Sequence, residues 1–273
     1  MKLVKPDILL SEKYGLVYER YVATPVNSNK LIEMFVKDGE QMGFEVDTFG
    51  KQPTDGGDLD MIGMYKETDS SKPYVYISSG IHGNEPAPPL AVLQLLNSGF
   101  FGDSCNWVIC PVMNPYGLMH STRRNFDGVD LNREYKHEKT PEITGHKQWL
   151  DQFVNIELTM SCHEDHDANG FYMYERHSRN ISSFAPQILQ HVQSVIRIDL
   201  DTEIDGEKAV NGVIHSEINR YKRKHWPELI YFSHKHTKGR HYTFETPSRF
   251  QLKTRIQAMK VAIGAAVKQI TYD

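Results

Sequence analysis

Strand-like and helix-like segments alternate along almost the whole chain. The run Tyr74-Val75-Tyr76-Ile77 is β-branched and aromatic, which favours a buried strand. A helix is expected next over Pro89 to Leu96, ended by Asn97-Ser98-Gly99. Further strands are predicted over 44–48, 61–65, 107–110, 156–162, 171–174 and 242–244, and further helices over 27–42, 141–154, 181–195 and 252–270. This alternation predicts an α/β protein built around a mostly parallel sheet.

The helices and breaks fit one domain spanning residues 1–273. The breaks at Gln52 to Asp58 and Asp201 to Glu207 are short enough to be loops inside a domain. Thr140 followed by Pro141 predicts a helix start. Ser248 and Gln251 fit a capping box ahead of the last helix.

Composition excludes several classes of protein. A net charge of −4 is too small and too negative for a general nucleic-acid binder. No apolar run approaches the ~18 residues of a membrane span, and the first residues do not resemble a secretory signal. Three cysteines argue against a disulfide framework. We therefore expect a cytoplasmic protein that binds neither nucleic acid nor membrane.

The first polar cluster follows the strand at Tyr74. His82 and Glu85 are three residues apart in a glycine-containing turn, a spacing that can point both side chains the same way. An imidazole and a carboxylate on one face can bind zinc. By itself this short pattern occurs often by chance, and an ordinary polar loop is then the simpler interpretation.

The second cluster lies where the strand 156–162 ends. His163 there could supply a third ligand, and three protein ligands with an open fourth position are typical of catalytic zinc. Side chains alternate along a strand, so Cys162 should face the core instead. His166 is the rival candidate for the third ligand.

Two further clusters complete the set. The segment from Asn114 to Arg133 is rich in arginine and asparagine, which suit recognition of a carboxylate. Glu245 closes the strand 242–244 ahead of a helix start, where it could be held rigidly in a cleft. The alternative for each is a solvated loop or a helix-terminal acid.

The ordered series resembles the zinc metallocarboxypeptidases of the carboxypeptidase A type, as a small, single-domain, bacterial-like member. That family carries H-x-x-E, N-P-x-G, R-x-N-x-x-G-x-D-x-N-R, a strand-end histidine and a late glutamate, in this order. The corresponding residues are His82, Glu85, Asn114, Pro115, Gly117, Arg123, Asn125, Gly128, Asp130, Asn132, Arg133, His163 and Glu245. The match runs from about Tyr74 to Pro247.

The resemblance implies a three-layer α/β/α fold with a mixed sheet of about eight strands and one zinc ion per chain. It implies that His82, Glu85 and His163 bind the zinc, and that Glu245 is the general base. It also implies that Arg123 stabilises the oxyanion. The expected activity is hydrolysis of the C-terminal peptide or peptide-like bond of short peptides.

The resemblance further implies that Asn132 and Arg133 bind the free C-terminal carboxylate of the substrate. Three details depart from the family pattern. Glu134 stands where a second asparagine is common, and neither Tyr221 nor Tyr231 aligns clearly with the family's mobile tyrosine. Only 81 residues precede His82, so activation by removal of a pro-segment is not expected.

Two alternatives to this function remain open. The aspartoacylase and succinylglutamate desuccinylase branch has the same zinc ligands and a D-L-N-R run, and hydrolyses N-acyl amino acids. A non-catalytic zinc-site protein that binds peptides is the other alternative. If the protein is a carboxypeptidase, a basic stretch from Asn219 to His241 could shape a pocket for an acidic side chain of the substrate. A solvated loop is the simpler interpretation of this stretch.

Overall fold

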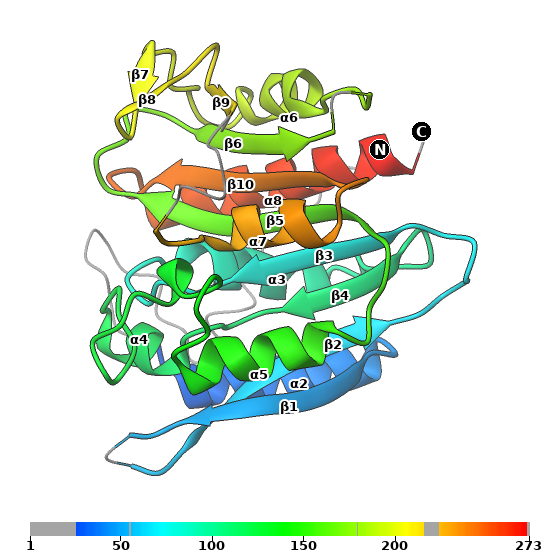
Figure 1. The fold of residues 1–273 in the computed structure, drawn as a ribbon, viewed down its shortest axis with the longest axis vertical. Helices are drawn as coiled ribbons and strands as arrows, with labels where there is room; N and C mark the ends of the chain where they lie inside the picture. Colours follow the sequence, from blue (N-terminus) through cyan, green and yellow to red (C-terminus); the bar gives the residue numbers. More distant parts are fainter. Residues whose placement is uncertain (1–25, 55, 179, 216–223, 272–273) are drawn as a thin grey trace.

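The computed structural model describes residues 26–271 except 55, 179 and 216–223, and Figure 1 draws them as a ribbon. Its centre is an eight-stranded sheet in the order β1-β2-β4-β3-β5-β10-β6-β9. These strands are β1 (Glu45–Gln52), β2 (Leu59–Lys66), β3 (Tyr74–Ser79), β4 (Asn106–Cys110), β5 (Ile156–Asp165), β6 (Tyr172–His177), β9 (Val213–His215) and β10 (Arg240–Pro247). The expected mixed sheet of about eight strands is confirmed.

Parallel pairing dominates the middle of the sheet. Strands β4, β3, β5 and β10 are parallel neighbours, whereas β1, β2 and β6 pair antiparallel with the strands on their inner side. Parallel strands all end at the same edge, so the segments that follow β3, β5 and β10 meet there. A separate hairpin, β7 (Glu203–Ile204) and β8 (Glu207–Lys208), occupies one of the two breaks expected from the sequence.

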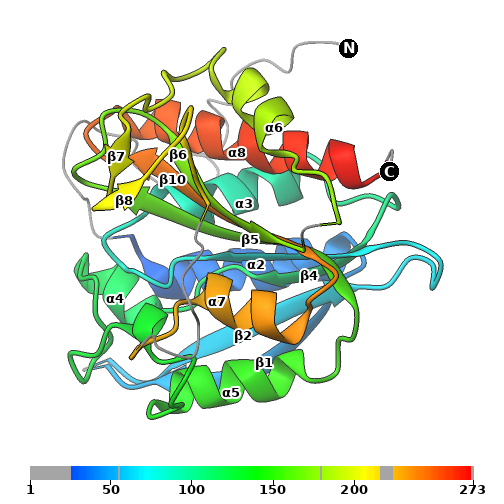
Figure 2. The same ribbon diagram turned by 45° about the horizontal axis from the view of Figure 1, so that its top comes forward.

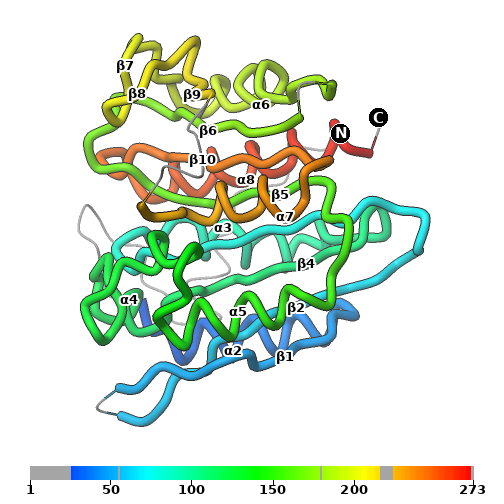
Figure 3. The backbone as a smooth tube through the Cα atoms, in the orientation of Figure 1, coloured from blue at the N-terminus to red at the C-terminus, as the bar shows by residue number. Residues whose placement is uncertain are grey.

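Helices cover both faces of the sheet, which gives the expected three layers (Figure 2). On one face lie α2 (Ser28–Gln41), α3 (Ala87–Asn97), α6 (Ala185–Val192) and α8 (Leu252–Ile270). On the other lie α5 (Pro141–Leu150) and α7 (Glu228–Lys235). The short helices α4 (Pro115–His120) and η1 (Leu131–Arg133) belong to the long connection between β4 and α5, which the tube in Figure 3 follows along one edge of the sheet.

Each face has its own apolar core. The larger core packs α2, α3, α6 and α8 against the sheet, with Leu31, Phe35, Trp107 and Phe244 fully buried. The smaller one packs α5 and α7 against β3 and β4 through side chains such as Tyr76. Strands buried on both sides explain why their sequences read as continuous apolar runs rather than alternating ones.

Element boundaries differ from the predictions in a few places. Helix α5 ends at Leu150 instead of 154, and α6 is shorter than the predicted 181–195. The predicted capping box is wrong, because Gln251 is the N-cap of α8 and its side chain makes no capping hydrogen bond. Helix α7 was missed, since its aromatic and β-branched residues, Ile230, Tyr231 and Phe232, do not favour a helix by local preference.

Within the described part of the chain, no helix is both long and apolar enough to cross a membrane.

Two buried histidines predict a loss of stability in mild acid. Burial lowers the pKa of His146 and of His241 to about 3, so the folded protein holds both neutral. An unfolded histidine titrates near ~6.5, so their contribution is complete above that pH and is lost as pH falls towards ~3. Each should cost about 1.4 kcal/mol of unfolding free energy per pH unit in that window.

Urea unfolding at several pH values from 7 to 5 measures this slope. The variant His241→Asn cannot titrate there, so its slope should be shallower than that of the wild type by one histidine's share. Equal slopes in the two proteins would contradict the assignment of His241 as a buried neutral group.

Candidate metal centre

The turn after β3 brings His82 and Glu85 together. Both side chains are buried, and His82 Nδ1 lies 2.6 Å from Glu85 Oε1. The turn is tight because Gly83 lies against Gly117 at the start of α4. A Cβ atom on Gly83 would come within 1.8 Å of the Gly117 carbonyl carbon, so only glycine fits there. The short distance between the two side chains shows that His82 and Glu85 point to the same side of this turn, as their spacing predicted.

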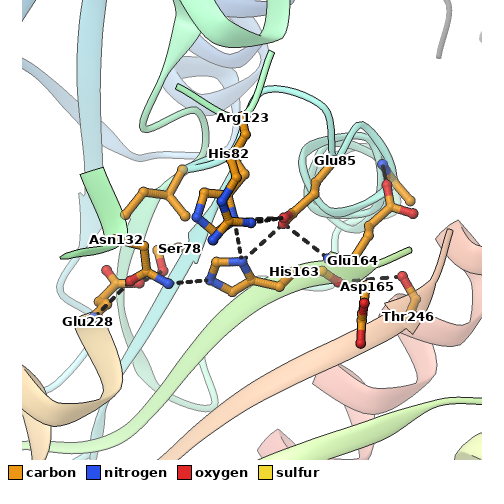
Figure 4. Close-up of polar contacts among 12 residues, drawn as sticks. Ser78, His82, Glu85, Arg123, Asn132, His163, Glu164, Asp165, Glu228 and Thr246 are labelled. Carbon is orange, nitrogen blue, oxygen red and sulfur yellow. Dashed lines mark hydrogen bonds and ion pairs between the residues drawn. The ribbon is translucent and has the colours of Figure 1, made fainter. Parts of the chain in front are cut away.

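His163 completes the group from the neighbouring strand β5 (Figure 4). Its Nδ1 lies 3.0 Å from Glu85 Oε2 and 3.2 Å from His82 Nδ1. Cys162, the residue before it, points into the larger apolar core, as predicted. His166, the rival candidate, is exposed and lies 3.4 Å from the Ser248 hydroxyl, outside this group.

The donor set fits a divalent metal ion. Within the described residues, the side chains of His82, Glu85 and His163 converge closely enough to share one metal ion. We call these three residues the metal group. Two nitrogens bound to one tetrahedral zinc ion at ~2.0–2.1 Å would be roughly 3.3 Å apart. The observed 3.2 Å between the two Nδ1 atoms matches that spacing. Without an ion between them, burying two imidazole nitrogens and a carboxylate that face one another would cost free energy of folding.

Asp130 orients the first histidine. Its Oδ1 lies 3.1 Å from His82 Nε2, the ring nitrogen that faces away from the shared position. Such a carboxylate–histidine contact fixes the ring and its tautomer in metal sites. Burial opposes ionisation of Asp130, but the hydrogen bond with His82 and the charge of Arg123 outweigh it and lower its pKa. The sequence motif contained Asp130, yet its role was not predicted.

Arg123 lies beside this pair. Its Nε donates to Asp130 Oδ2 at 3.0 Å, and its Nη1 lies 3.7 Å from Glu85 Oε1. The side chain is 40% exposed, so the guanidinium can still meet a ligand from solvent. The structure thus places Arg123 next to the metal group.

Glu164 supports the group from behind. Its backbone N–H donates to Glu85 Oε2 at 3.0 Å, and its own carboxylate accepts from the N–H of Ala87 at the start of α3. The carboxylate also pairs with Arg255 of α8. Burial raises the pKa of Glu164 to about 7 despite this pair. No local sequence signal linked Glu164 to an arginine some ninety residues away.

Glu245 stands directly beside His163 in the sheet. The two residues are register partners in the parallel pair β5–β10. Paired positions on adjacent strands present their side chains to the same face. Burial raises the pKa of Glu245 well above its usual value, and the charge of Glu85 adds to the rise while His163 opposes it. The register with His163 therefore places Glu245 beside the metal group.

Asn132 and Arg133 differ in their surroundings. Asn132 is buried, with Nδ2 3.5 Å from His163 Nε2 and Oδ1 accepting the backbone N–H of Glu228 at 2.9 Å. Arg133 is exposed and donates to the carbonyl of Asn132 at 3.0 Å. Asn132 thus borders the metal group, and Arg133 lies one residue further out.

Glu228 is a buried acid that the sequence reading did not single out. It starts α7, and its carboxylate accepts from Tyr76 Oη at 2.7 Å and from Ser78 Oγ at 2.5 Å. Figure 4 shows it on the far side of Asn132 from His163. Glu228 therefore fixes the start of α7 against β3 and, through its backbone, the amide of Asn132.

The two tyrosine candidates have different outcomes. Tyr221 lies outside the described residues. Tyr231 is buried in α7, where its hydroxyl accepts from Lys235 at 3.2 Å and its ring packs on Tyr135. These contacts turn the Tyr231 hydroxyl towards Lys235 rather than towards the metal group.

The basic stretch is likewise only partly described, since Arg220, Lys222 and Arg223 fall outside. In the described part, Lys235 pairs with Asp151, and Arg240 is buried over the ring of Phe184. Lys238 is exposed. The described part of the stretch is thus not the solvated loop of the simpler interpretation, because α7 and the start of β10 occupy most of it.

A comparison with protein families finds a match to part of the chain. The sequence model of the succinylglutamate desuccinylase/aspartoacylase catalytic domain matches residues 71–180, which is less than half of the chain. This range contains the three clustered ligands, Arg123 and Asn132, but not Glu245. A comparison with curated proteins found no sequence match.

Solved structures share the fold at low sequence identity. A protein from Shewanella denitrificans OS217, described as a proposed metallopeptidase, has a TM-score of 0.76 and 22% identity over 89% of this chain and 92% of its own. A metallo-carboxypeptidase from Burkholderia cenocepacia has a TM-score of 0.66 and 17% identity over 90% and 69%. A metallo-carboxypeptidase from Pseudomonas aeruginosa, solved with (2-guanidinoethylmercapto)succinic acid, has a TM-score of 0.62 and 14% identity over 87% and 68%.

These findings show the fold and a sequence similarity over part of the chain. The chain has the carboxypeptidase-type fold, as the sequence resemblance predicted. It combines this fold with a desuccinylase/aspartoacylase sequence pattern and a buried His-Glu-His group. The matched sequence range contains all three residues of that group.

Proposed function

We propose that this protein is a zinc-dependent metallocarboxypeptidase that releases the C-terminal residue of short peptides. The observation that carries the proposal is the convergence of the buried group His82, Glu85 and His163 with Glu245 on the adjacent strand. A metal site, a neighbouring carboxylate and an exposed guanidinium are the parts that metal-assisted amide hydrolysis needs.

One zinc ion per chain, held by His82, Glu85 and His163, would acidify a water and polarise the scissile carbonyl. Glu245 takes a proton from the attacking water and delivers it to the leaving amine. The Arg123 guanidinium, partly exposed beside Glu85, stabilises the negative charge that develops on the carbonyl oxygen. Asp130 holds His82 and Arg123 in place for these steps.

The substrate's free carboxylate is assigned to Asn132 and Arg133. The Asn132 Oδ1 atom is occupied by the Glu228 N–H, which leaves the Nδ2 donors for the substrate, and Arg133 adds an exposed cation. The Pseudomonas aeruginosa neighbour was solved with a succinic acid derivative, a compound with two carboxylates, which agrees with a site that recognises this group.

Hydrolysis of N-acyl amino acids is the second candidate. The matched desuccinylase/aspartoacylase domain and the run Asp130-Leu131-Asn132-Arg133 favour it. Both reactions break an amide whose leaving amine carries a carboxylate, so the same residues would serve either. They differ only in the size of the acyl group.

A matched substrate series separates the candidates. Each member ends in the same amino acid, carries an acetyl, succinyl or dipeptidyl acyl group, and is paired with its C-terminal amide. We expect the purified protein with one zinc to cleave the dipeptidyl member fastest and to spare the amides, as read by mass spectrometry.

Faster cleavage of the acetyl or succinyl member would instead establish the second candidate. Equal cleavage of acids and amides would contradict carboxylate recognition by Asn132 and Arg133. No cleavage of any member by the zinc-loaded protein would favour a peptide binder without catalytic activity.

A further inference from the structure

Arg123 and Asp130 are carried by a loop with little regular structure. The loop runs between α4 and η1, and its compact part, residues 125–129, is closed by the Asn125 side chain. Asn125 Oδ1 accepts the Val129 N–H at 2.8 Å, and Gly128 takes the positive φ that this closure requires. Asp130 follows immediately, so the shape of this loop decides where its carboxylate meets His82.

The other end of the Asn125 amide is anchored in the protein interior. Asn125 Nδ2 donates to Glu142 Oε1 at 2.8 Å, and Asn125 is almost completely buried. Glu142 lies in the first turn of α5 and is also buried. A helix N-terminus favours a carboxylate at this position.

Gln52, at the end of β1, ties the same carboxylate to α4. Its Nε2 donates to Glu142 Oε1 at 3.0 Å and to Asn114 Oδ1 at 3.2 Å, and its Oε1 accepts the N–H of Tyr116 at 2.8 Å. Asn114 caps α4, which contacts the Gly83 turn of the metal group. Glu142 and Gln52 thus join two segments that both border the metal group.

This arrangement has a specific polarity. Two amide N–H groups, from Gln52 and Asn125, converge on one oxygen of Glu142. The second oxygen, Oε2, is buried and has no hydrogen-bond partner among the described residues. A buried carboxylate oxygen without a donor lowers the stability of the fold. The contacts that Glu142 makes with both segments are the feature that offsets this cost.

We infer that Glu142 is a positioning residue, which acts through Asn125 to hold Asp130 against His82 and Arg123 against Glu85. The effect on catalysis that this inference predicts rests on the proposed function. The effect on metal affinity does not, because the contacts that lead from Glu142 through Asn125 and Asp130 to His82 are independent of the substrate.

The first test is a double-mutant cycle read by zinc affinity, with a chelator as competitor and the full-length protein. Asp130→Ala removes the carboxylate on a metal-binding histidine and should weaken zinc binding about 10–100-fold. Glu142→Ala should weaken it about tenfold, the lower end of that range, because it displaces Asp130 without removing it. In the double variant Glu142→Ala should add little, since both changes act on one contact.

Glu33→Ala is the control, since Glu33 is an exposed glutamate in α2. It should bind zinc as the wild type does. The inference would be overturned if the losses of zinc affinity in Glu142→Ala and Asp130→Ala multiplied in the double variant. Such independence would mean that Glu142 acts on the fold as a whole. An unchanged zinc affinity in Glu142→Ala would overturn it as well.

The second test exchanges donor and acceptor. Asn125→Asp places a carboxylate against Glu142 and should weaken zinc binding at least as much as Glu142→Ala. Adding Glu142→Gln restores one donor and one acceptor in reversed order towards position 125, but it turns the new amide nitrogen towards the Gln52 Nε2 donor, so it should recover part of the affinity. This pair decides the question if Glu142→Ala fails to fold, and failure of the exchange to recover affinity would contradict the inference.

A kinetic readout completes the design. Glu142→Ala should lower kcat more than it raises KM, and the loss should largely vanish in an Arg123→Ala background. If the wild type cleaves none of the amides tested, the proposed function fails, but the zinc-affinity cycle still tests the role of Glu142.

Discussion

Replacing Glu245 with glutamine is expected to lower kcat/KM about 10²–10⁴-fold while the protein keeps its metal. The change removes the proton acceptor that the mechanism assigns to this position, and general-base catalysis is typically of that size. Glutamine has nearly the same shape, so the sheet register beside His163 should be unchanged. Metal content by elemental analysis and hydrolysis of the best substrate measure both parts.

The matched control is Glu157→Gln, because Glu157 lies on the adjoining strand β5 but is exposed. Its activity should equal that of the wild type. If Glu245→Gln retained activity within a few-fold, Glu245 would not be the general base. Loss of metal from Glu245→Gln would instead indicate that the side chain belongs to the metal site itself.

Replacing His163 with alanine is expected to abolish metal binding at the wild-type stoichiometry, and activity with it. The substitution removes one of three converging donors and leaves His82 and Glu85 facing each other without the third. Removal of metal from the wild type by a chelator should produce the same inactive state, and added zinc should restore only the wild type. Inductively coupled plasma spectrometry and activity before and after zinc addition provide the measurement.

His166→Ala serves as the control for the second prediction. His166 is exposed beside Ser248 and should be dispensable for metal binding. Full metal content in His163→Ala, or loss of metal in His166→Ala, would show that the third ligand is assigned to the wrong histidine.

The metal ligands and the neighbouring acid that the sequence predicted share one property: each lies near the end of a strand that is apolar enough to be identified, or just past it. His82, His163 and Glu245 lie at the ends of β3, β5 and β10, and parallel strands end at a common edge. The spacing of the motif between β4 and α5 added Arg123 and Asn132. Their proximity in the structure follows from the order of strands in the sheet.

The supporting contacts could not be predicted in the same way. Glu164 with Arg255, and Glu142 with Gln52, join residues that are about ninety positions apart in the sequence. In the sequence these are ordinary polar residues, which most often lie on the surface. Only the packing of α8 on β5, or of α5 near β1, reveals that they are buried and paired.

Helix α7 illustrates a related limit. Its charged neighbours suggested a basic loop, whereas its apolar residues Ile230, Tyr231 and Phe232 are buried against the sheet. Tertiary burial, rather than helix propensity, stabilises this segment, and a single sequence does not reveal it.

The register of β5 and β10 has a consequence for redesign. The third metal ligand and the neighbouring carboxylate are side by side on adjacent strands, so their separation is set by the sheet spacing of ~4.8 Å and not by any loop. The loop between β4 and α5 carries Arg123, Asp130 and Asn132, so changes there would alter how these residues meet the metal group but not the spacing of the strand pair. A library restricted to positions of that loop outside the residues assigned to the site should leave His163 and Glu245 at their present spacing.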